Sequence, residues 1–529
     1  MHDDMQVIRQ LDFEKCLTDG QIPCRWVPDL GYGYGYPLFN YYPPLPYIVG
    51  QVWRTVGASF TDTVKFTALT QIILGAFFMY LLGASLTNKW GGLISALFFT
   101  YAPYHAVNIY IRGAMNEAWA ATFFPLVLYF IRRAILDSKV KYYLGISLSF
   151  GLILLSHNPM ALIFAPLAIL WSLYWLFISQ KQFLKTIVSL AMSVVLSLLF
   201  SAFYTLPLLV ETKLVQIESM FSGYYHYSVH FATIKQLFIS NFWGDGPSVW
   251  GTEDKMSFMI GYLHWILPIF VFIAYLFKFK KSHKFIDLFP PALVLIGFFS
   301  AFMSHERSTP FWQIFPVIQN VQFPWRFLNL TTFIFSTSII FLVNLIKKPI
   351  FYVLIITSLL ILNLGYFYPI HSGPVTDSQK FSGQSWRLLI TASIYDYLPK
   401  SAETAPKSPS VGLIDEIIPS DISLTIKNEK HGTDWFFVNF NLNSDAQIIF
   451  GQLDFPNFLI LDQDQPIPHF TENKLGRIGV NLKAGNHQLF AKLQNTPIRT
   501  LANLLSLVSW ISLFICLIRY LWLKLTPRK

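Results

Sequence analysis

The acidic and basic side chains best suited to chemistry stand near the ends of long hydrophobic segments. Asp3 and Asp4 lie at the start of the chain, and Glu117 opens an apolar run further along. A carboxylate in such a place can accept a proton from an attacking hydroxyl group. Arg112 and Arg326 lie at two further ends, and arginine binds phosphate and stabilises the charge of a leaving phosphate. Together these residue types suit transfer of a group from a lipid phosphate.

Two histidines lie near similar segment ends. His2 precedes Asp3, and His157 follows another hydrophobic run. We count both, with Arg112 and Arg326, as candidate substrate-binding residues. Taken singly, each is more often a polar cap at a helix end, where solvation costs little. The histidines lack a metal-ligand spacing such as H-E-x-x-H, so the sequence assigns no metal ligand and leaves a divalent cation open as a cofactor.

The composition is that of a membrane protein with many spans. Of the 529 residues, 53% are hydrophobic and 13% are charged, which is about half of the ~25% charged in soluble domains. This excludes a large soluble protein, and the 17% of aromatic residues exclude a disordered chain. The 39 Lys and Arg exceed the 29 Asp and Glu. In a membrane protein such an excess belongs to cytoplasmic loops, so we expect no nucleic-acid partner.

Eleven segments are long enough to cross a bilayer, because a span needs about 20 apolar residues. They cover residues 64–86, 91–110, 115–134, 140–156, 159–179, 184–208, 257–278, 285–303, 324–346, 349–368 and 499–522. Every second connection is short and basic, and the positive-inside rule places these connections in the cytoplasm. Among their residues are Lys89, Lys181 and Lys281, and the tail with Arg528 and Lys529 also falls inside.

The same rule divides the chain into four parts. Residues 1–63 form a first extracytoplasmic loop, 64–368 the helical membrane domain, 369–498 an extracytoplasmic domain, and 499–529 a last helix with a basic cytoplasmic tail. The protein is then a multi-pass protein of the inner or plasma membrane, and its candidate site faces outward. Because an exported first loop normally follows a helix, we expect the natural reading frame to start upstream and encode one more span.

Residues 369–498 differ from the rest of the chain in their pattern. Ile422, Leu424 and Ile426 alternate with polar residues, and 435–442 is a second alternating run rich in aromatic residues. Turn signals separate these and further short runs, which is typical of an antiparallel β-sandwich. The predicted fold class is therefore mainly α, polytopic, with an extracytoplasmic β-sandwich before the last helix.

The three cysteines are too few for a disulfide scaffold or a cysteine-rich zinc site. Cys16 and Cys24 lie close enough in sequence to pair outside the cell. We interpret them instead as two unrelated free thiols.

Several strings resemble one bacterial family of multi-spanning membrane proteins, filed as 6-pyruvoyl-tetrahydropterin synthase-related. These strings are His2-Asp3, Gly33–Phe39, Tyr42–Leu45, Tyr110–Ala114 with Glu117, Gln322–Phe327 and Tyr397–Pro399. The resemblance extends over nearly the whole chain. The true synthase is a small soluble zinc enzyme, and its ligand pattern does not occur in this sequence.

In architecture this family looks like the GT-C glycosyltransferases, membrane enzymes that take sugars from polyprenyl-phosphate donors. The likeness implies a GT-C-like bundle of about 11 spans. Those enzymes carry an acidic residue in the first outer loop and often a second in the next. The likeness thus implies that Asp3 or Asp4 is the main catalytic carboxylate and Glu117 its partner, with Arg112 and Arg326 on the donor phosphate. The implied partners are membrane lipid, a polyprenyl-phosphate-linked sugar, and a glycan or envelope acceptor.

Three functions follow from these observations. The leading hypothesis is a GT-C-type glycosyltransferase acting on an extracytoplasmic acceptor, with the β-domain binding the acceptor glycan or bracing the loops. The second is a flippase or transporter of a lipid-linked saccharide, which would favour charges in mid-span and inverted repeats; neither is visible in the sequence. The third is a non-catalytic protein of envelope assembly. Convergence of the outer carboxylates in one cleft would distinguish the first from the others.

Overall fold

The computed structural model describes residues 2–179, 183–251, 254–368 and 373–525. The basic residues Lys181, Arg528 and Lys529, which the sequence places in the cytoplasm, lie outside these described residues. The chain forms two compact units. The first unit is Met1–Asp4, Thr63–Leu198 and Met220–Pro374, and the second is Met5–Asp62, Leu199–Ser219 and Val375–Lys529.

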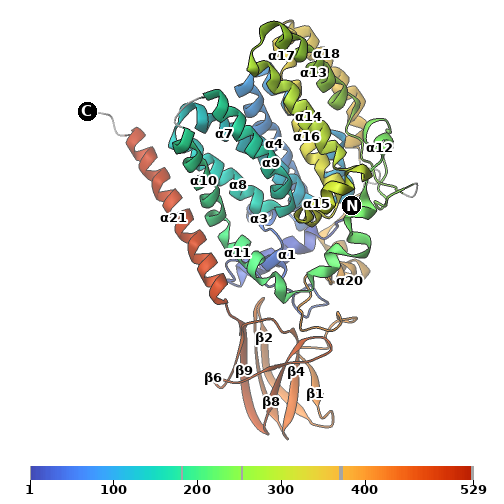
Figure 1. Ribbon diagram of the computed structural model, residues 1–529. Helices are drawn as coiled ribbons and strands as arrows, with labels where there is room; N and C mark the ends of the chain where they lie inside the picture. The colour runs from blue at the N-terminus through green and yellow to red at the C-terminus, as the bar shows by residue number, and fades with distance from the viewer. Residues whose placement is uncertain (1, 180–182, 252–253, 369–372, 526–529) are drawn as a thin grey trace. The chain divides into compact units, whose positions relative to one another are not determined.

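Within the described residues, nine helical segments are long and apolar enough to cross a membrane (Figure 1). They are α4 (Phe60–Leu86), α7 (Met115–Asp137), α9 (Asn158–Ser179), α10 (Phe183–Phe200), α13 (Tyr262–Ser282), Phe285–Phe302 with α14 (Phe289–Phe302), Pro324–Leu345 with α16 (Phe327–Ile339) and α17 (Leu342–Leu345), Pro349–Phe367 with α18 (Pro349–Asn363), and α21 (Pro497–Leu525). The predicted class of mainly helical, polytopic membrane protein is confirmed.

Two of the eleven predicted spans form shorter helices. The segment 140–156 is α8 (Val140–Ser156), whose 17 residues stand at the lower limit of about 17 for a span. The segment 91–110 begins as α5 (Lys89–Thr100) and then breaks. It breaks because Ala102 precedes Pro103 and is extended, with φ −70° and ψ 135°. The chain continues as α6 (Pro103–Ala106) and the π-helical η1 (Val107–Arg112).

The first unit is held together around α7 and α16. Helix α7 packs against α8 and α9, and α16 contacts α5, α13 and α14. All thirteen residues of α16 are buried. The ring of Phe124 on α7 stacks on Phe164 of α9 at 4.2 Å and meets Phe333 of α16 edge-on at 5.8 Å. The N-terminal ends of α7 and α16 are therefore fixed against a common core. The surface of this unit also carries two short helices, α12 (Ile234–Phe238) and α15 (Thr309–Ile314).

The second unit joins the first loop, α11 (Ala202–Glu211), the β-domain and the last helix. Its other helices are α1 (Gln6–Thr18), α2 (Leu38–Tyr41), α3 (Leu45–Thr55), α19 (Asp377–Lys380) and α20 (Gly383–Thr391). Helix α11 packs along α21. Nε of Arg499 on α21 donates to the Glu211 carboxylate of α11 at 2.8 Å, and both side chains are buried. This ion pair fixes the start of the last helix within the unit.

Cys16 and Cys24 form a disulfide, with an S–S distance of 2.07 Å and a Cα–Cα distance of 5.4 Å. The expectation of two unrelated free thiols is therefore wrong. Eight residues of sequence separate the two cysteines, and the turn after α1 returns the chain to bring them together. A disulfide agrees with the predicted outer location of this loop, because disulfides persist in oxidising compartments.

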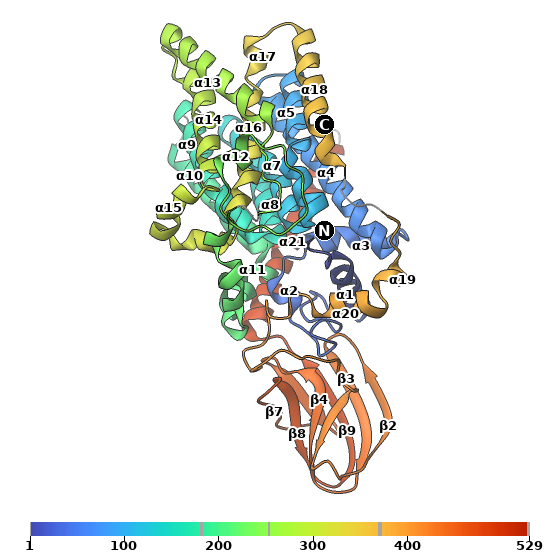
Figure 2. The ribbon, with the colours of Figure 1, turned by 90° about the vertical axis from the view of Figure 1, so that its right-hand side faces the viewer.

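The β-domain is a sandwich of two antiparallel sheets (Figure 2). One sheet has the order β1 (Ile414–Ile418), β4 (Ala446–Leu453), β8 (Arg477–Leu482), β7 (Phe470–Thr471), and the other the order β2 (Leu424–His431), β3 (Trp435–Leu442), β9 (Gly485–Leu493), β5 (Phe458–Asp462), β6 (Gln465–Pro466). Along β3 buried and half-buried residues alternate, as a two-layer sandwich requires. The predicted β-sandwich before the last helix is confirmed.

Candidate functional site

The candidate site of the first unit is built where η1 meets α7. Arg112 ends η1, and Gly113 follows with φ 64° in the left-handed region, where glycine is not penalised. This turn reverses the chain, and Glu117 comes in the first turn of α7. The N-terminal end of a helix dipole stabilises a carboxylate there. Local geometry thus brings Arg112 and Glu117 together across only five residues.

Glu117 pairs with two arginines. Nη1 and Nη2 of Arg112 donate to its two carboxylate oxygens at 2.8 and 2.7 Å, and Nε of Arg326 donates to Oε2 at 3.0 Å. Arg326 lies just before α16, so this contact joins residues 209 apart in the sequence. Glu117 is 1% exposed. Its carboxylate is fully engaged and cannot readily accept a further proton donor.

Two asparagines that the sequence analysis did not select complete the cluster. Nδ2 of Asn329 donates to Oε1 of Glu117 at 2.6 Å, and Nδ2 of Asn108 donates to Oδ1 of Asn329 at 2.7 Å. Oδ1 of Asn108 in turn accepts from Nη1 of Arg112 at 2.6 Å. Asn108 precedes Arg112 by four residues and Asn329 follows Arg326 by three. Residues three or four positions apart share one helix face. This spacing from Arg112 and Arg326 is the sequence signal that could have identified Asn108 and Asn329.

The cluster carries an excess of positive charge. Arg112 and Arg326 supply two positive charges and Glu117 one negative charge, so these three side chains sum to +1. Burial alone would lower the pKa of Arg112, but the Glu117 carboxylate outweighs burial and holds that pKa above its ordinary value. The Arg112 guanidinium also lies 4.2 Å from the ring centre of Trp325. The side chains of Arg112 and Arg326 remain 9% and 10% exposed, which is a small accessible edge.

His157 lies at the junction of α8 and α9, close enough to Arg326 and Glu117 to feel their charges. Burial and the charge of Arg326 lower its pKa to about 3, although Glu117 opposes the shift. Nδ1 of His157 accepts a hydrogen bond from the backbone N–H of Met160 at 3.3 Å. Any contact of His157 with a substrate would therefore be made by a neutral imidazole.

The start of the chain lies beside the same cluster. The backbone N–H groups of His2 and Asp3 donate to the carbonyl oxygens of Ile111 and Arg112, both at 2.8 Å. The charge of Asp3 contributes to the raised pKa of Arg112. The exposed His2 side chain donates from Nε2 to the carbonyl oxygen of Asp245 at 2.7 Å. Asp4 belongs to the same unit and is half-buried.

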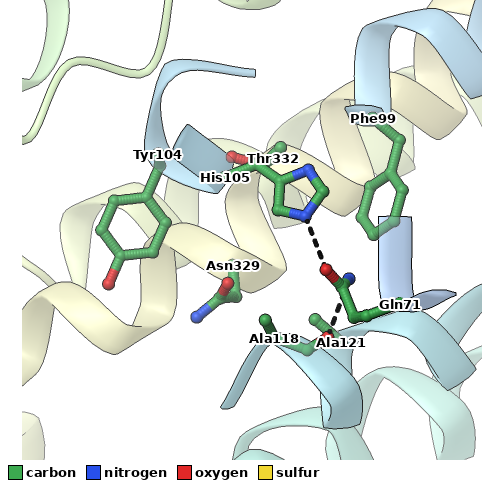
Figure 3. A pocket seen from close by; sticks show the side chains of 8 residues that line it. All are labelled: Gln71, Phe99, Tyr104, His105, Ala118, Ala121, Asn329 and Thr332. Carbon is green, nitrogen blue, oxygen red and sulfur yellow. Dashed lines mark hydrogen bonds between the residues drawn. The ribbon is translucent and has the colours of Figure 1, made fainter. Parts of the chain in front are cut away.

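A small cavity lies next to the cluster, below Tyr104 and Asn329 (Figure 3). Its volume is about 10 Å³, room for about one water molecule. Oε1 of Gln71 accepts a hydrogen bond from Nε2 of His105 at 3.3 Å beside this cavity (Figure 3). Nε2 of Gln71 donates to Oγ1 of Thr122 at 2.7 Å. The cavity is thus too small to admit a sugar.

The side chains of this cluster are mostly cationic or neutral amide groups, and the cationic guanidinium groups offer no lone pair to a metal ion. Over the ranges that the structure describes, no three His, Cys, Asp or Glu side chains converge as a metal site. The Glu117 carboxylate is neutralised by the arginines that pair with it. The arrangement is suited to holding an anion near a proton acceptor in the first residues of the chain, rather than to metal coordination by these side chains.

Two comparisons place the chain among known proteins. The sequence profile of a family described as "6-pyruvoyl-tetrahydropterin synthase related domain; membrane protein" matches residues 39–370. An uncharacterized protein of Lactococcus lactis subsp. cremoris (strain MG1363) is 25% identical over 279 residues. That alignment covers 50% of this chain and 44% of the relative, so the chain matches less than half of the relative's length.

Proposed function

Because the chain belongs to the 6-pyruvoyl-tetrahydropterin synthase related family of membrane proteins, we propose that it is a membrane glycosyltransferase. It would transfer a sugar from a polyprenyl-phosphate donor to an extracytoplasmic acceptor. The observation that carries this proposal is the junction of Arg112, Arg326 and Glu117 with the first residues of the chain. An excess positive charge beside a carboxylate is what such a transfer needs.

The proposed roles divide between the arginines and the terminal aspartates. Arg112 and Arg326 hold the donor phosphate through their exposed edges and stabilise the charge that develops as the sugar leaves. Glu117 keeps the two guanidinium groups in place, since its own oxygens already accept hydrogen bonds from both. Asp3 or Asp4 takes the proton from the acceptor hydroxyl. His2 and His157 line the approach as further substrate contacts.

One observation favours a second candidate, a non-catalytic protein of envelope assembly. The Glu117 carboxylate is buried and saturated by the two arginines and Asn329. Such a cluster is also what a purely structural clamp between η1, α7 and α16 would look like. The two functions differ in whether a purified protein consumes donor.

A donor-consumption assay tests the proposal. The purified protein in lipid nanodiscs is incubated with a panel of polyprenyl-phosphate sugars and with envelope glycans that supply the acceptor hydroxyl, and release of the polyprenyl phosphate is measured. Asp3→Asn and Asp4→Asn are made separately, and loss of the base should lower the rate by about 10²–10⁴ in one of them. Arg326→Lys should raise the donor concentration needed for half-maximal rate, because lysine cannot reproduce the guanidinium geometry.

Glu306→Gln is the matched control, because Glu306 is an exposed carboxylate elsewhere in the first unit. It should leave the rate unchanged. If no donor in the panel is consumed by folded wild-type protein, the transferase assignment is wrong and the assembly role stands. If Asp3→Asn and Asp4→Asn both keep full activity, the assignment of the base to these aspartates is wrong.

A further inference from the structure

The outward face of one β-sheet has an unusual set of side chains. Register along β3 and β9 places Asn439 opposite Gln488, Asn441 opposite Asn486, and Phe437 opposite Phe490. On β3 these residues are the half-buried members of the alternation, while the residues between them are buried in the sandwich core. All six therefore point away from the core, on the sheet with order β2-β3-β9-β5-β6.

This face is divided into a polar end and an aromatic end. The polar end carries five side-chain amides: Asn428, Asn439, Asn441, Asn486 and Gln488. The aromatic end carries Trp435, Phe437 and Phe490, and the rings of Trp435 and Phe490 are 6.2 Å apart. Adjacent strands are about 4.8 Å apart and alternate residues about 6.8 Å. The amides and rings thus form a grid whose spacings, about 4.8 Å by about 6.8 Å, are close to the size of one sugar ring.

The five amides of this face differ in how far they are already hydrogen-bonded. Within the part of the chain that the structure describes, the side-chain amides of Asn439 and Gln488 form no hydrogen bond with other protein groups, and Gln488 is exposed. Oδ1 of Asn486 accepts from Nδ2 of Asn441 at 3.0 Å and from Nζ of Lys427 at 2.9 Å, so these two amides are engaged. Trp435 is fixed at its end of the face by a hydrogen bond from Nε1 to Asp19 at 3.0 Å. A ligand would therefore meet preformed aromatic rings beside unengaged amides.

We propose that this face of the sandwich, the Asn439–Gln488 face, binds a neutral saccharide chain. Amides donate and accept hydrogen bonds, as sugar hydroxyl groups do. Aromatic rings cover the apolar C–H side of a sugar, as they cover other flat apolar surfaces. The lysines of this face are Lys427, Lys430 and Lys492, and Nζ of Lys427 donates to Oδ1 of Asn486 at 2.9 Å. That charge is too small for a nucleic acid or an anionic membrane.

The opposite sheet offers a control with matched chemistry. Gln447 of β4 lies opposite Asn481 of β8, and both are exposed. This pair has the same two residue types as Asn439 and Gln488 and sits on the outer face of the other sheet. Beside it the register gives no aromatic pair comparable to Phe437 and Phe490.

The test is calorimetric titration of the full-length protein in nanodiscs with neutral hexasaccharides of glucose, mannose and galactose. At least one should bind, and Asn439→Ala with Gln488→Ala should weaken binding about tenfold, as expected for two lost hydrogen bonds. Gln447→Ala with Asn481→Ala should change the affinity by less than about twofold. Equal weakening by both double variants, or no binding of any hexasaccharide, would overturn the proposal.

Two further measurements separate the alternatives. Flotation with anionic vesicles that lack sugar should not depend on Asn439 and Gln488; a dependence would make the face a membrane contact and overturn the proposal. The titration contains no lipid-linked donor. Failure of saccharide binding would therefore leave the proposed transferase reaction standing, and failure of donor consumption would leave this surface standing. Only the idea that the bound saccharide is the acceptor rests on the proposed function.

Discussion

Replacing Glu117 by glutamine should destabilise the protein far more than an ordinary change of one charge. The carboxylate accepts hydrogen bonds from Arg112, Arg326 and Asn329 while 1% exposed. A glutamine keeps one oxygen but turns an NH₂ group toward donors that need an acceptor. It also leaves two buried guanidinium groups without a counter-ion. Removing one partner of a buried ion pair typically costs about 3–5 kcal/mol, and we expect a loss of that size.

The control lies at the other end of the same helix. Asp137 at the end of α7 pairs with Arg133 at 2.7 Å, and these side chains are 24% and 36% exposed. Half-exposed pairs of this spacing contribute about 0.3–0.5 kcal/mol, so Asp137→Asn should change the free energy of unfolding by no more than that. Both variants are compared with wild type by unfolding in sodium dodecyl sulfate, followed by circular dichroism.

A double variant tests the cause of the loss. Arg326→Gln in the Glu117→Gln background removes one of the two unbalanced charges, so it should restore part of the stability rather than add to the loss. The reasoning is refuted if Glu117→Gln costs no more than Asp137→Asn. It is equally refuted if the effects of Glu117→Gln and Arg326→Gln simply add.

Three other predictions can be checked independently. Reporter fusions after Lys281 and within 400–410 should lie in opposite compartments, because the positive-inside rule separates them; the same compartment for both would contradict the topology. Burial raises the pKa of Asp254 to about 6, above its unfolded value of about 3.9. Stability should therefore fall as pH rises from about 4 to 6, by about 1 kcal/mol for this half-buried group, and thermal unfolding of Asp254→Asn should lose this dependence. Peptide mapping without reductant should find Cys16 joined to Cys24, and two alkylated thiols at these positions would contradict the structure.

The sequence determined the class of this protein through properties that need no tertiary contact. Long apolar segments must be helices in a bilayer, because backbone groups have no other partner there. Alternation in 435–442 predicted a strand, and β3 (Trp435–Leu442) spans those residues. Pro103 accounts for the break of the segment 91–110, because the residue before a proline disfavours the helical conformation. A measure of hydropathy alone overlooks this local signal. The disulfide was not predictable, because it depends on how the turn after α1 returns.

In the candidate site, too, some contacts follow from the local sequence and others only from the tertiary structure. Arg112 and Glu117 could be matched from sequence, since five residues and one glycine turn separate them. Arg326 is 209 residues from Glu117 in the sequence, and it contacts Glu117 only because α16 packs against α7. Sequence could suggest that each residue lay near a helix end. Only the fold decided that Glu117 is saturated by two guanidinium groups, because hydrogen-bond saturation depends on which side chains share one buried space.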